Sequence, residues 1–353
     1  MERLIAIGTL ILVLVVIASL LATPTVDYRG IWLHYGDQLI FTTSYQLEDV
    51  RFYRGETLCQ FEKISSNRWK IEMGETVSNM FKCEARFRNG IVWYTLELDL
   101  QKDNVRFVVY GDSRHNRKIH ERIFKKIVEF EPDFVVHLGD MVDYGNSSEN
   151  WQDFFDVVGE YWSKHIVYTV KGNHEFPFKF YNDVLYPPYY FVYRNGMLMI
   201  FLDSISSISS GSPQGKFLES LLEKYDDVAE YIMIFMHHPV FTVGPHRKDK
   251  IVKELKELVP LLARYRVSVV FGAHDHAFQH FMKDGVNYVV TAGGGAHLYT
   301  LRKDIESGAK MLKGLSTHHF LVVDKTSFSL RLALVNKEGK KLYEFSIPSR
   351  LKR

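Results

Sequence analysis

Carboxylate, amide and imidazole side chains recur in short turns that each follow an apolar run. The turns are written GD, GDMVD, GNHE, HH and GAHDH in chain order. The candidate metal-binding and catalytic residues among them are Asp112, Asp140, Asp143, Asn173, His174, His237, His238, His274 and His276. This mixture of oxygen and nitrogen donors suits divalent or trivalent cations of borderline hardness better than one structural zinc. The pattern therefore predicts a site for two metal ions.

The apolar runs before these turns are predicted to be strands of an α/β sheet. Such runs lie at 105–110, 133–138, 166–170, 197–202, 231–236, 267–271 and 287–292. Helical patterns lie between them at 117–130, 213–225 and 250–265. Ligands of open α/β sheets bind beyond the carboxyl ends of the strands, so the five turns should converge. Residues 318–347 return to strands and are expected to extend the same domain.

Residues 25–102 have a different rhythm of short β-branched and aromatic segments separated by turns such as RGE and RNG. That rhythm predicts a small antiparallel sandwich, a fibronectin III-like all-β domain. We find no catalytic constellation in it and expect a packing or spacer module. The predicted organisation is a membrane segment at 1–24, the sandwich at 25–102 and a catalytic domain at 103–353.

The N-terminal stretch 4–26 contains no charged residue. It is long enough to cross a bilayer as a helix, whereas a signal peptide has a shorter apolar region. Leu20, Leu21 and Ala22 make a poor cleavage site, so we favour an uncleaved transmembrane helix over secretion after signal cleavage. Arg3 favours an inside N-terminus. The expected location is the cell membrane, with the remainder of the single-pass chain outside.

The 353 residues are 46% hydrophobic and 24% charged with a net charge of +2, an ordinary composition for a folded protein. No block of Lys and Arg indicates nucleic acid as a partner. Cys59 and Cys83 are the two cysteines. An external location would permit a disulfide between them, and two free thiols are the alternative.

The order GD, GDxxD, GNHE, HH and HxH resembles the calcineurin-like metallophosphoesterases, and within them the branch of the purple acid phosphatases. The resemblance covers about residues 104–345 and includes the Gly-rich segment YVVTAGGGAHLY at 288–299. It implies a β-sandwich core flanked by helices. A β-sandwich before the catalytic domain is also frequent in that branch.

The resemblance implies a ligand set for two metals, which could be Fe, Mn or Zn. Asp140 would bridge the metals, Asp112 and His276 would hold the first, and Asn173, His237 and His274 would hold the second. Two further positions are implied to be catalytic: His174 would meet the phosphate and the leaving group, and His246 would face the substrate. His238 is left out of the ligand set.

Arg114 stands where many members of the wider family have a histidine ligand. A guanidinium has no lone pair to offer a metal. Purple acid phosphatases supply a tyrosine three residues after the bridging Asp, and here that position is Asp143, with Tyr144 next. Asp143 is therefore the first choice for the missing ligand, before His115 and a water. Arg114 itself could grip a phosphate oxygen, and Arg114→Ala is predicted to weaken substrate binding without loss of metal.

The resulting functional hypothesis is hydrolysis of phosphate esters by hydroxide formed from metal-coordinated water. We expect a phosphomonoesterase acting outside the membrane on a phosphate-ester substrate. A phosphodiesterase would share these ligands and stays open. A different class, a non-catalytic membrane-tethered module for metal binding or adhesion, is favoured only by the absent D-x-H histidine. The oligomeric state is not predicted.

Overall fold

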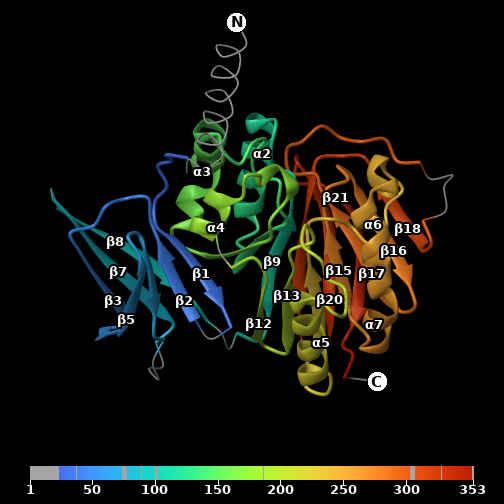
Figure 1. The fold of residues 1–353 in the computed structure, drawn as a ribbon, viewed down its shortest axis with the longest axis horizontal. Coiled ribbons are helices and arrows are strands. Elements are labelled where there is room, and N and C mark those ends of the chain that lie inside the picture. Colours follow the sequence, from blue (N-terminus) through green and yellow to red (C-terminus); the bar gives the residue numbers. More distant parts are fainter. Residues whose placement is uncertain are drawn as a thin grey trace, which may run out of the picture.

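The structure, a computed structural model, describes residues 24–36, 38–73, 78–88, 90–99, 102–185, 187–302, 307–326 and 328–351. Two large sheets lie face to face, and a third, smaller sheet lies at the N-terminal side (Figure 1). Helices cover the outer faces of the large sheets.

The first large sheet has ten strands. In spatial order they are β21 (Lys341–Pro348), β20 (Ser329–Asn336), β19 (His319–Lys325), β9 (Val105–Tyr110), β10 (Phe134–His137), β11 (Ile166–Thr169), β1 (Ile31–Tyr35), β2 (Gln38–Thr42), β6 (Arg68–Ile71) and β5 (Phe61–Ser65). Strands β9, β10 and β11 are parallel neighbours. Strand β19, the first of the three strands in the C-terminal stretch, pairs antiparallel with β9. This stretch therefore extends the sheet, as the sequence predicted.

The second large sheet has seven strands. In spatial order they are β12 (Tyr190–Arg194), β13 (Met197–Phe201), β14 (Tyr231–Phe235), β15 (Val269–Gly272), β17 (Val286–Thr291), β16 (Phe278–Lys283) and β18 (Lys310–Leu315). Strands β13, β14, β15 and β17 are parallel, and every residue of β13 and β14 is buried. Strands covered on both faces have continuous apolar sequences, which explains why these runs do not alternate.

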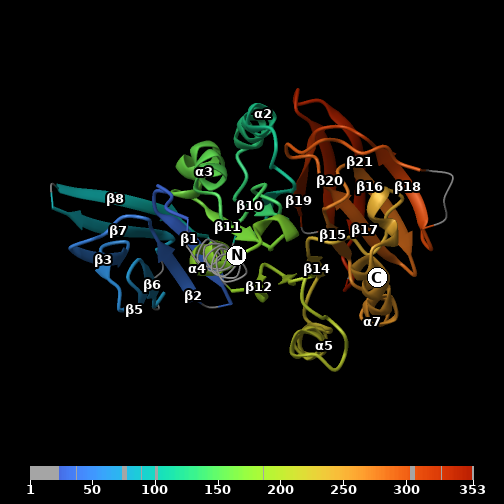
Figure 2. The same cartoon turned by 45° about the horizontal axis from the view of Figure 1, so that its top comes forward.

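The two large sheets share one core between their facing sides. Tyr168 of β11 stacks on Phe201 of β13 with ring centroids 5.3 Å apart, and Phe201 stacks on Phe235 of β14 at 4.8 Å. The helices α2 (Arg117–Glu129), α3 (Ser148–Trp162) and α4 (Lys179–Leu185) cover the outer side of the first sheet. Figure 2 shows α2 and α3 on that side. The predicted α/β fold with a sandwich core flanked by helices is confirmed.

On the second sheet the outer helices are α5 (Pro213–Tyr225), α6 (Lys250–Leu255) and α7 (Val259–Arg264). The sequence predicted one helix over 250–265, but a 3-10 turn at Lys256–Leu258 separates α6 from α7. Pro260 lies in the first turn of α7, where its missing N–H costs nothing, whereas inside a longer helix it would break a hydrogen bond.

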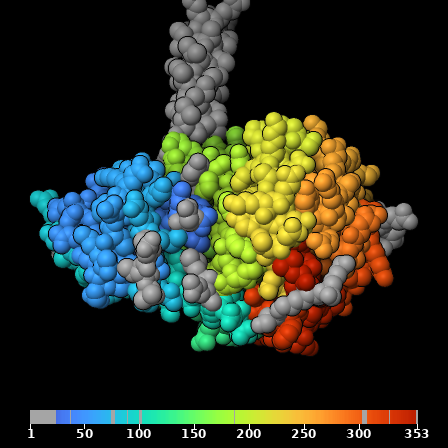
Figure 3. All heavy atoms as spheres, turned by 90° about the horizontal axis from the view of Figure 1, so that it is seen from below, coloured from blue at the N-terminus to red at the C-terminus, as the bar shows by residue number. Residues whose placement is uncertain are grey.

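The strands of residues 25–102 form two facing sheets, but one of these sheets continues into the rest of the chain. The smaller sheet is β4 (Thr57–Leu58), β3 (Asp49–Arg54), β7 (Met80–Phe87) and β8 (Gly90–Glu97). Opposite it, β1 pairs in parallel with β11, with Trp32 beside Ile166. Figure 3 shows these N-terminal strands in continuous contact with the remainder. The domain boundary at 102 stays a prediction, and the ten-stranded sheet crosses it.

The predicted membrane segment and the state of the two cysteines can also be compared with the structure. Within the described ranges, no helix is both long and apolar enough to cross a membrane, and the segment predicted as an anchor lies almost wholly in residues 1–23, outside those ranges. Cys59 and Cys83 are free thiols, so the alternative of a disulfide between them is not realised.

Candidate metal centre

The loops after the central strands meet where the carboxyl ends of both large sheets come together. The backbone N–H of His274, after β15, donates to Asp112 Oδ2, after β9, at 3.1 Å. His237, after β14, donates through Nδ1 to the carbonyl of Leu138, after β10, at 2.8 Å. Each of these hydrogen bonds joins one sheet to the other. The sequence-based expectation that the turns converge is therefore met by the geometry.

Three of the predicted ligands lie in left-handed backbone. Asp112, Asp140 and His274 have φ values of 56°, 55° and 67°. This region is unfavourable for residues with a side chain, although Asp tolerates it better than most. Strained backbone of this kind persists where the surroundings fix it, and it is common at functional sites. Here it turns each side chain from the strand end toward the other loops.

Two glycines allow the GD and GN loops to touch. A Cβ at Gly139, whose φ is +87°, would lie 2.5 Å from the backbone nitrogen of Gly172. A Cβ at Gly172 would lie 2.3 Å from the backbone nitrogen of Asp140. The backbones after β10 and β11 can approach this closely only without side chains.

Glu175 fastens the same two loops together. Its fully buried carboxylate accepts backbone N–H groups from Gly172 at 2.6 Å, Asp140 at 3.0 Å and Met141 at 2.7 Å. Burial, with the nearby charge of Asp140, raises the pKa of Glu175 to about 8. We did not predict this role from the sequence, although Glu175 is the last residue of GNHE.

Three potential metal-binding atoms lie around His237 Nε2 at the second predicted metal site. His237 Nε2 lies 3.1 Å from Asn173 Oδ1, 3.2 Å from His274 Nδ1 and 3.4 Å from Asp140 Oδ1. Ligands held at about 2.0–2.2 Å from a common cation lie roughly 3–3.5 Å from one another. The spacing of this set therefore fits one metal ion.

The proton of His237 points away from these atoms. His237 donates Nδ1–H to a carbonyl, which leaves a lone pair on Nε2. His274 faces this nitrogen through Nδ1 at 3.2 Å, and its Nε2 lies 3.6 Å from Asp249 Oδ2. Burial lowers the pKa of both rings far below the ordinary value, and neutral imidazoles are the form that binds metals. The lone pair of His237 Nε2 faces Asn173 Oδ1 and Asp140 Oδ1, which carry no proton either, so a cation fits between them.

The first predicted site contains three of its expected donors. Asp112, Asp140 and His276 each offer an atom within 4.8 Å of the others, and Asp112 Oδ1 lies 3.2 Å from His276 Nε2. His276 Nδ1 donates to the carbonyl of His297 at 2.6 Å, which directs Nε2 toward the carboxylate. Burial raises the pKa of Asp112. Burial opposes protonation of His276, but its hydrogen bond with Asp112 raises the pKa of that ring overall.

Asp143, predicted to complete the first site, is not brought to these donors. Its Oδ1 lies 3.1 Å from an Nη of Arg114 and 2.6 Å from His115 Nδ1, and its Oδ2 accepts the backbone N–H of His115 at 3.2 Å. Among the described residues neither Asp143 nor His115 shares a potential metal-binding group with Asp112. Both oxygens of Asp143 face nitrogen donors instead, so the arrangement does not support either residue as the missing ligand.

Arg114 lies between two carboxylates. Its side chain is 9% exposed, Nε donates to Asp140 Oδ2 at 3.2 Å, and an Nη donates to Asp143. The guanidinium thus sits at the metal centre without being a ligand. The contact of Arg114 with a phosphate oxygen stays a prediction.

His174 and His246, the two predicted substrate-facing histidines, both lie at the centre. His174 donates Nδ1–H to the carbonyl of Asp143 at 2.9 Å, and its Nε2 lies 4.0 Å from Asp140 Oδ2. His246 pairs through Nδ1 with Asp249 at 2.9 Å, and its ring centroid is 4.1 Å from that of His274. Each side chain is about one-third exposed, so each could meet a substrate from solvent.

Sequence reasoning missed several neighbours of the centre. His238, which we left out, has a ring nitrogen within 4.8 Å of nitrogens of His237 and His274, while Nδ1 bonds the hydroxyl of Ser204 at 2.9 Å. Tyr299 stacks on His276 with centroids 4.2 Å apart. No local pattern marks Ser204, whereas Tyr299 ends the Gly-rich segment that the resemblance had already drawn attention to.

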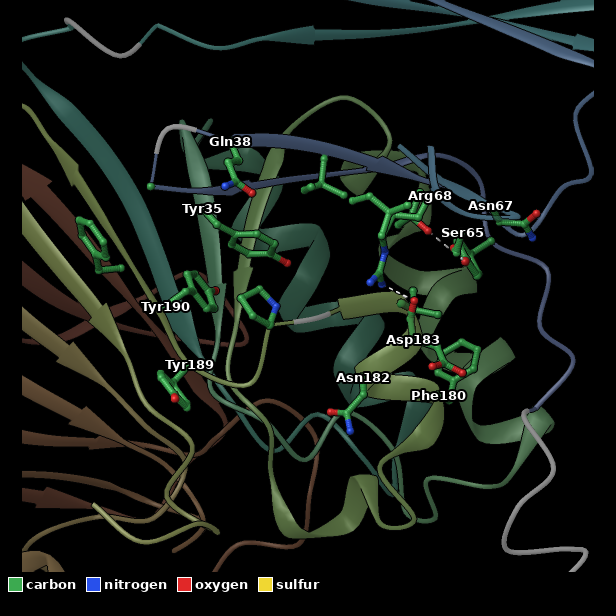
Figure 4. A pocket seen from close by; sticks show the side chains of 18 of the residues that line it. Tyr35, Gln38, Ser65, Asn67, Arg68, Phe180, Asn182, Asp183, Tyr189 and Tyr190 are labelled. Atoms are coloured by element: carbon green, nitrogen blue, oxygen red, sulfur yellow. Dashed lines mark hydrogen bonds between the residues drawn. The ribbon is translucent and has the colours of Figure 1, made fainter. Parts of the chain in front are cut away.

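A cavity of about 1380 Å³ lies elsewhere, between the N-terminal strands and the segment from α4 to β12. Figure 4 shows Tyr35, Arg68 and Tyr190 along its wall, with Arg68 donating to the carbonyl of Asp183. None of the predicted metal-binding residues lines it. The volume of this cavity is therefore no argument about the chemistry at the strand ends.

Two facing sheets thus carry candidate metal-binding side chains beyond their carboxyl ends. Residues 105–278 match the family model for calcineurin-like phosphoesterases. The chain carries a domain of that family, and within the family it is similar to the purple acid phosphatases.

Two relatives and one solved structure illustrate this similarity. Rat (Rattus norvegicus) tartrate-resistant acid phosphatase type 5 is 26% identical over 131 residues, 34% of this chain and 38% of that protein. Probable purple acid phosphatase 20 of Arabidopsis thaliana is 27% identical over 205 residues, 51% of this chain and 47% of that protein. The purple acid phosphatase PPD1 of yellow lupin (Lupinus luteus) has a TM-score of 0.75 at 14% identity, over 93% of this chain and 75% of that one. The last likeness concerns the fold, and the matched region spans less than half of both curated relatives.

Proposed function

We propose that this chain hydrolyses phosphate esters at a centre of two metal ions. The observation that carries the proposal is the cluster around His237 Nε2: Asn173, His274 and Asp140 lie 3.1, 3.2 and 3.4 Å from this nitrogen, while the proton of His237 is donated to a backbone carbonyl on the other side of the ring. Asp112 and His276 supply donors for a second cation beside Asp140. When bound, such cations acidify water and offset charge on a phosphoryl group. The metals could be Fe, Mn or Zn.

The side chains of the protein would do the remaining work. The Nδ1–H of His174 is held by a backbone carbonyl, so Nε2 is the nitrogen that exchanges a proton with the departing oxygen. His246 is held by Asp249 and lies against the ring of His274, and from there it would contact the phosphate. Glu175 keeps the loops of Asp140 and Asn173 in register.

A phosphomonoester is the substrate class that we propose, with a diester as the alternative. The test compares p-nitrophenyl phosphate with its bis ester, with metal content measured on the same sample of the full-length chain. Metal-dependent turnover that is faster with the monoester, and that Asp140→Asn abolishes, supports the proposal. Asp153→Asn, the same change on the exposed side of α3, is the matched control and should keep full turnover.

The other outcomes assign a different function. A faster bis-ester rate makes the protein a diesterase. Absence of turnover with every divalent cation, in a chain that binds metal, leaves the non-catalytic metal-binding or adhesion module.

We also propose, from the sequence alone, that residues 1–24 anchor the chain in the cell membrane with the catalytic domain outside, and that residues 25–102 are a fibronectin III-like module. Cleavage and secretion is the alternative for the location. Protease treatment of intact cells, followed by detection of the catalytic domain, tests the location: protection of that domain from the protease would contradict an outside position.

A further inference from the structure

We propose that the two metal sites are unequal: the site of Asn173, His237 and His274 binds its cation tightly, and the site of Asp112 and His276 binds weakly because Arg114 lies beside it as a fixed cation. The inference rests on the proposed metal centre and concerns how that centre is loaded.

The donor counts of the two sites differ. The tight site has four protein donors, namely His237 Nε2 and the atoms of Asn173, His274 and Asp140 that lie 3.1–3.4 Å from it. The weak site has three, namely Asp112, Asp140 and His276. The residue expected to add a fourth, Asp143, faces Arg114 and His115 instead. Fewer protein donors leave more of the coordination to water, which lowers affinity.

The two oxygens of Asp140 are also used differently. Oδ1 lies 3.4 Å from His237 Nε2 and accepts the backbone N–H of His174 at 3.0 Å, which places it toward the tight site. Oδ2 accepts Arg114 Nε at 3.2 Å. The guanidinium therefore already neutralises part of the carboxylate that would be shared between the cations.

The charge of Arg114 cannot be removed by a proton. Arginine stays protonated at any pH that the protein survives, and this side chain is nine-tenths buried, so water screens its charge poorly. A divalent ion brought within several ångströms of a buried positive charge is repelled strongly enough to change its affinity by about 100-fold or more. Asp143, whose Oδ1 lies 3.1 Å from an Nη of Arg114, offsets part of this repulsion.

This arrangement revises our sequence-based expectation for Arg114. From the sequence, removal of the guanidinium was expected to leave the metal content unchanged. From the structure, removal of the charge should strengthen the weak site. A histidine at position 114 would in addition supply a donor.

The test is a Mn²⁺ titration of the metal-stripped full-length chain by calorimetry, with bound metal counted after gel filtration. The wild type should bind one ion tightly and a second at least about 100-fold more weakly. R114Q and R114H should narrow that ratio at least tenfold, while R114K, which keeps the charge, should preserve it. Arg117 is an exposed cation in the same segment, so R117Q serves as the control and should leave the ratio unchanged.

Two results would overturn the inference: equal affinities in the wild type, or a ratio that R114Q and R114H both leave unchanged. His237→Ala should remove the tight step alone, and loss of the weak step instead would contradict the assignment of sites. Unequal binding without ester turnover would contradict the proposed function and support this inference. Ester turnover with two equally tight ions would support the proposed function and contradict this inference.

Discussion

His237 and His274 face each other through ring nitrogens 3.2 Å apart, although they follow different strands, β14 and β15. The His237 nitrogen in this contact offers a lone pair, because the other ring nitrogen donates its proton to the carbonyl of Leu138. We expect His237→Ala and His274→Ala each to lower metal affinity by about 100-fold or more, measured by metal analysis after dialysis. His165→Ala, a half-buried imidazole stacked on Tyr161, is the control. Full metal content in either ligand variant would refute the assignment of that residue.

His174 is expected to act on the leaving group and not on the metals. His174→Asn should lower kcat by about 100-fold with metal content unchanged. The loss should be larger for an alkyl phosphate than for p-nitrophenyl phosphate, because the alkoxide needs a proton to depart. Rates with both esters, measured on metal-replete samples, check this. Equal losses with the two esters would argue that His174 only positions Asp140, whose Oδ1 accepts its backbone N–H.

An iron-loaded sample is expected to lack a tyrosinate-to-iron charge-transfer band. The Tyr144 side chain is 68% exposed, which is inconsistent with a ligand inside the centre. Tyr299 stacks on His276, and burial raises its pKa, which disfavours the tyrosinate. The visible spectrum of the iron form checks the expectation. If a band appears, Tyr144→Phe and Tyr299→Phe identify its source, and loss of the band in the first variant would contradict the placement of Tyr144.

Glu175 is expected to matter for stability before it matters for chemistry. Glu175→Ala would leave several buried backbone N–H groups without an acceptor, each of which costs about 1–3 kcal/mol. Some of that cost is recovered by water, so we expect a loss of roughly 3 kcal/mol in the free energy of unfolding, measured by urea titration. Glu121→Ala, which removes an exposed partner of Arg117 on α2, should change it by less than about 1 kcal/mol. Similar values for the two variants would show that Glu175 does not hold the loops.

His120 is expected to weaken the fold in acid. Burial lowers its pKa to about 3, and its Nε2 contacts the hydroxyl of Tyr110 at 3.2 Å. The unfolded state therefore binds more protons than the folded state between about pH 3 and 6.5, so stability is full above that range and falls as the pH falls through it. His120→Gln should reduce the slope of stability against pH by up to about 1.4 kcal/mol per pH unit there. Urea unfolding of the wild type and of His120→Gln at pH 7, 6 and 5 checks this. Equal slopes of unfolding free energy against pH in the two proteins would contradict it.

The sequence by itself determined the central strands and the kinds of side chain at their ends. Long buried strands have continuous apolar runs, and the turn glycines and ligands follow each run directly, so both are visible locally. The same locality explains why α2 and α5 were predicted close to their observed bounds. Asp112, Asp140, Asn173, His237, His274 and His276 all stand at these strand ends, and the family resemblance then implied that they are the ligands.

Only the tertiary structure decided the relations between residues far apart in the chain. The pairing of Trp32 with Ile166, which carries the N-terminal strands into the first sheet, joins backbones with no shared local pattern. The partners of Arg114 were hidden for the same reason, since position in a motif does not tell which oxygen a guanidinium meets. Type and order of residues are local properties, whereas distance, burial and charge balance belong to the folded chain. The candidate metal centre needs both.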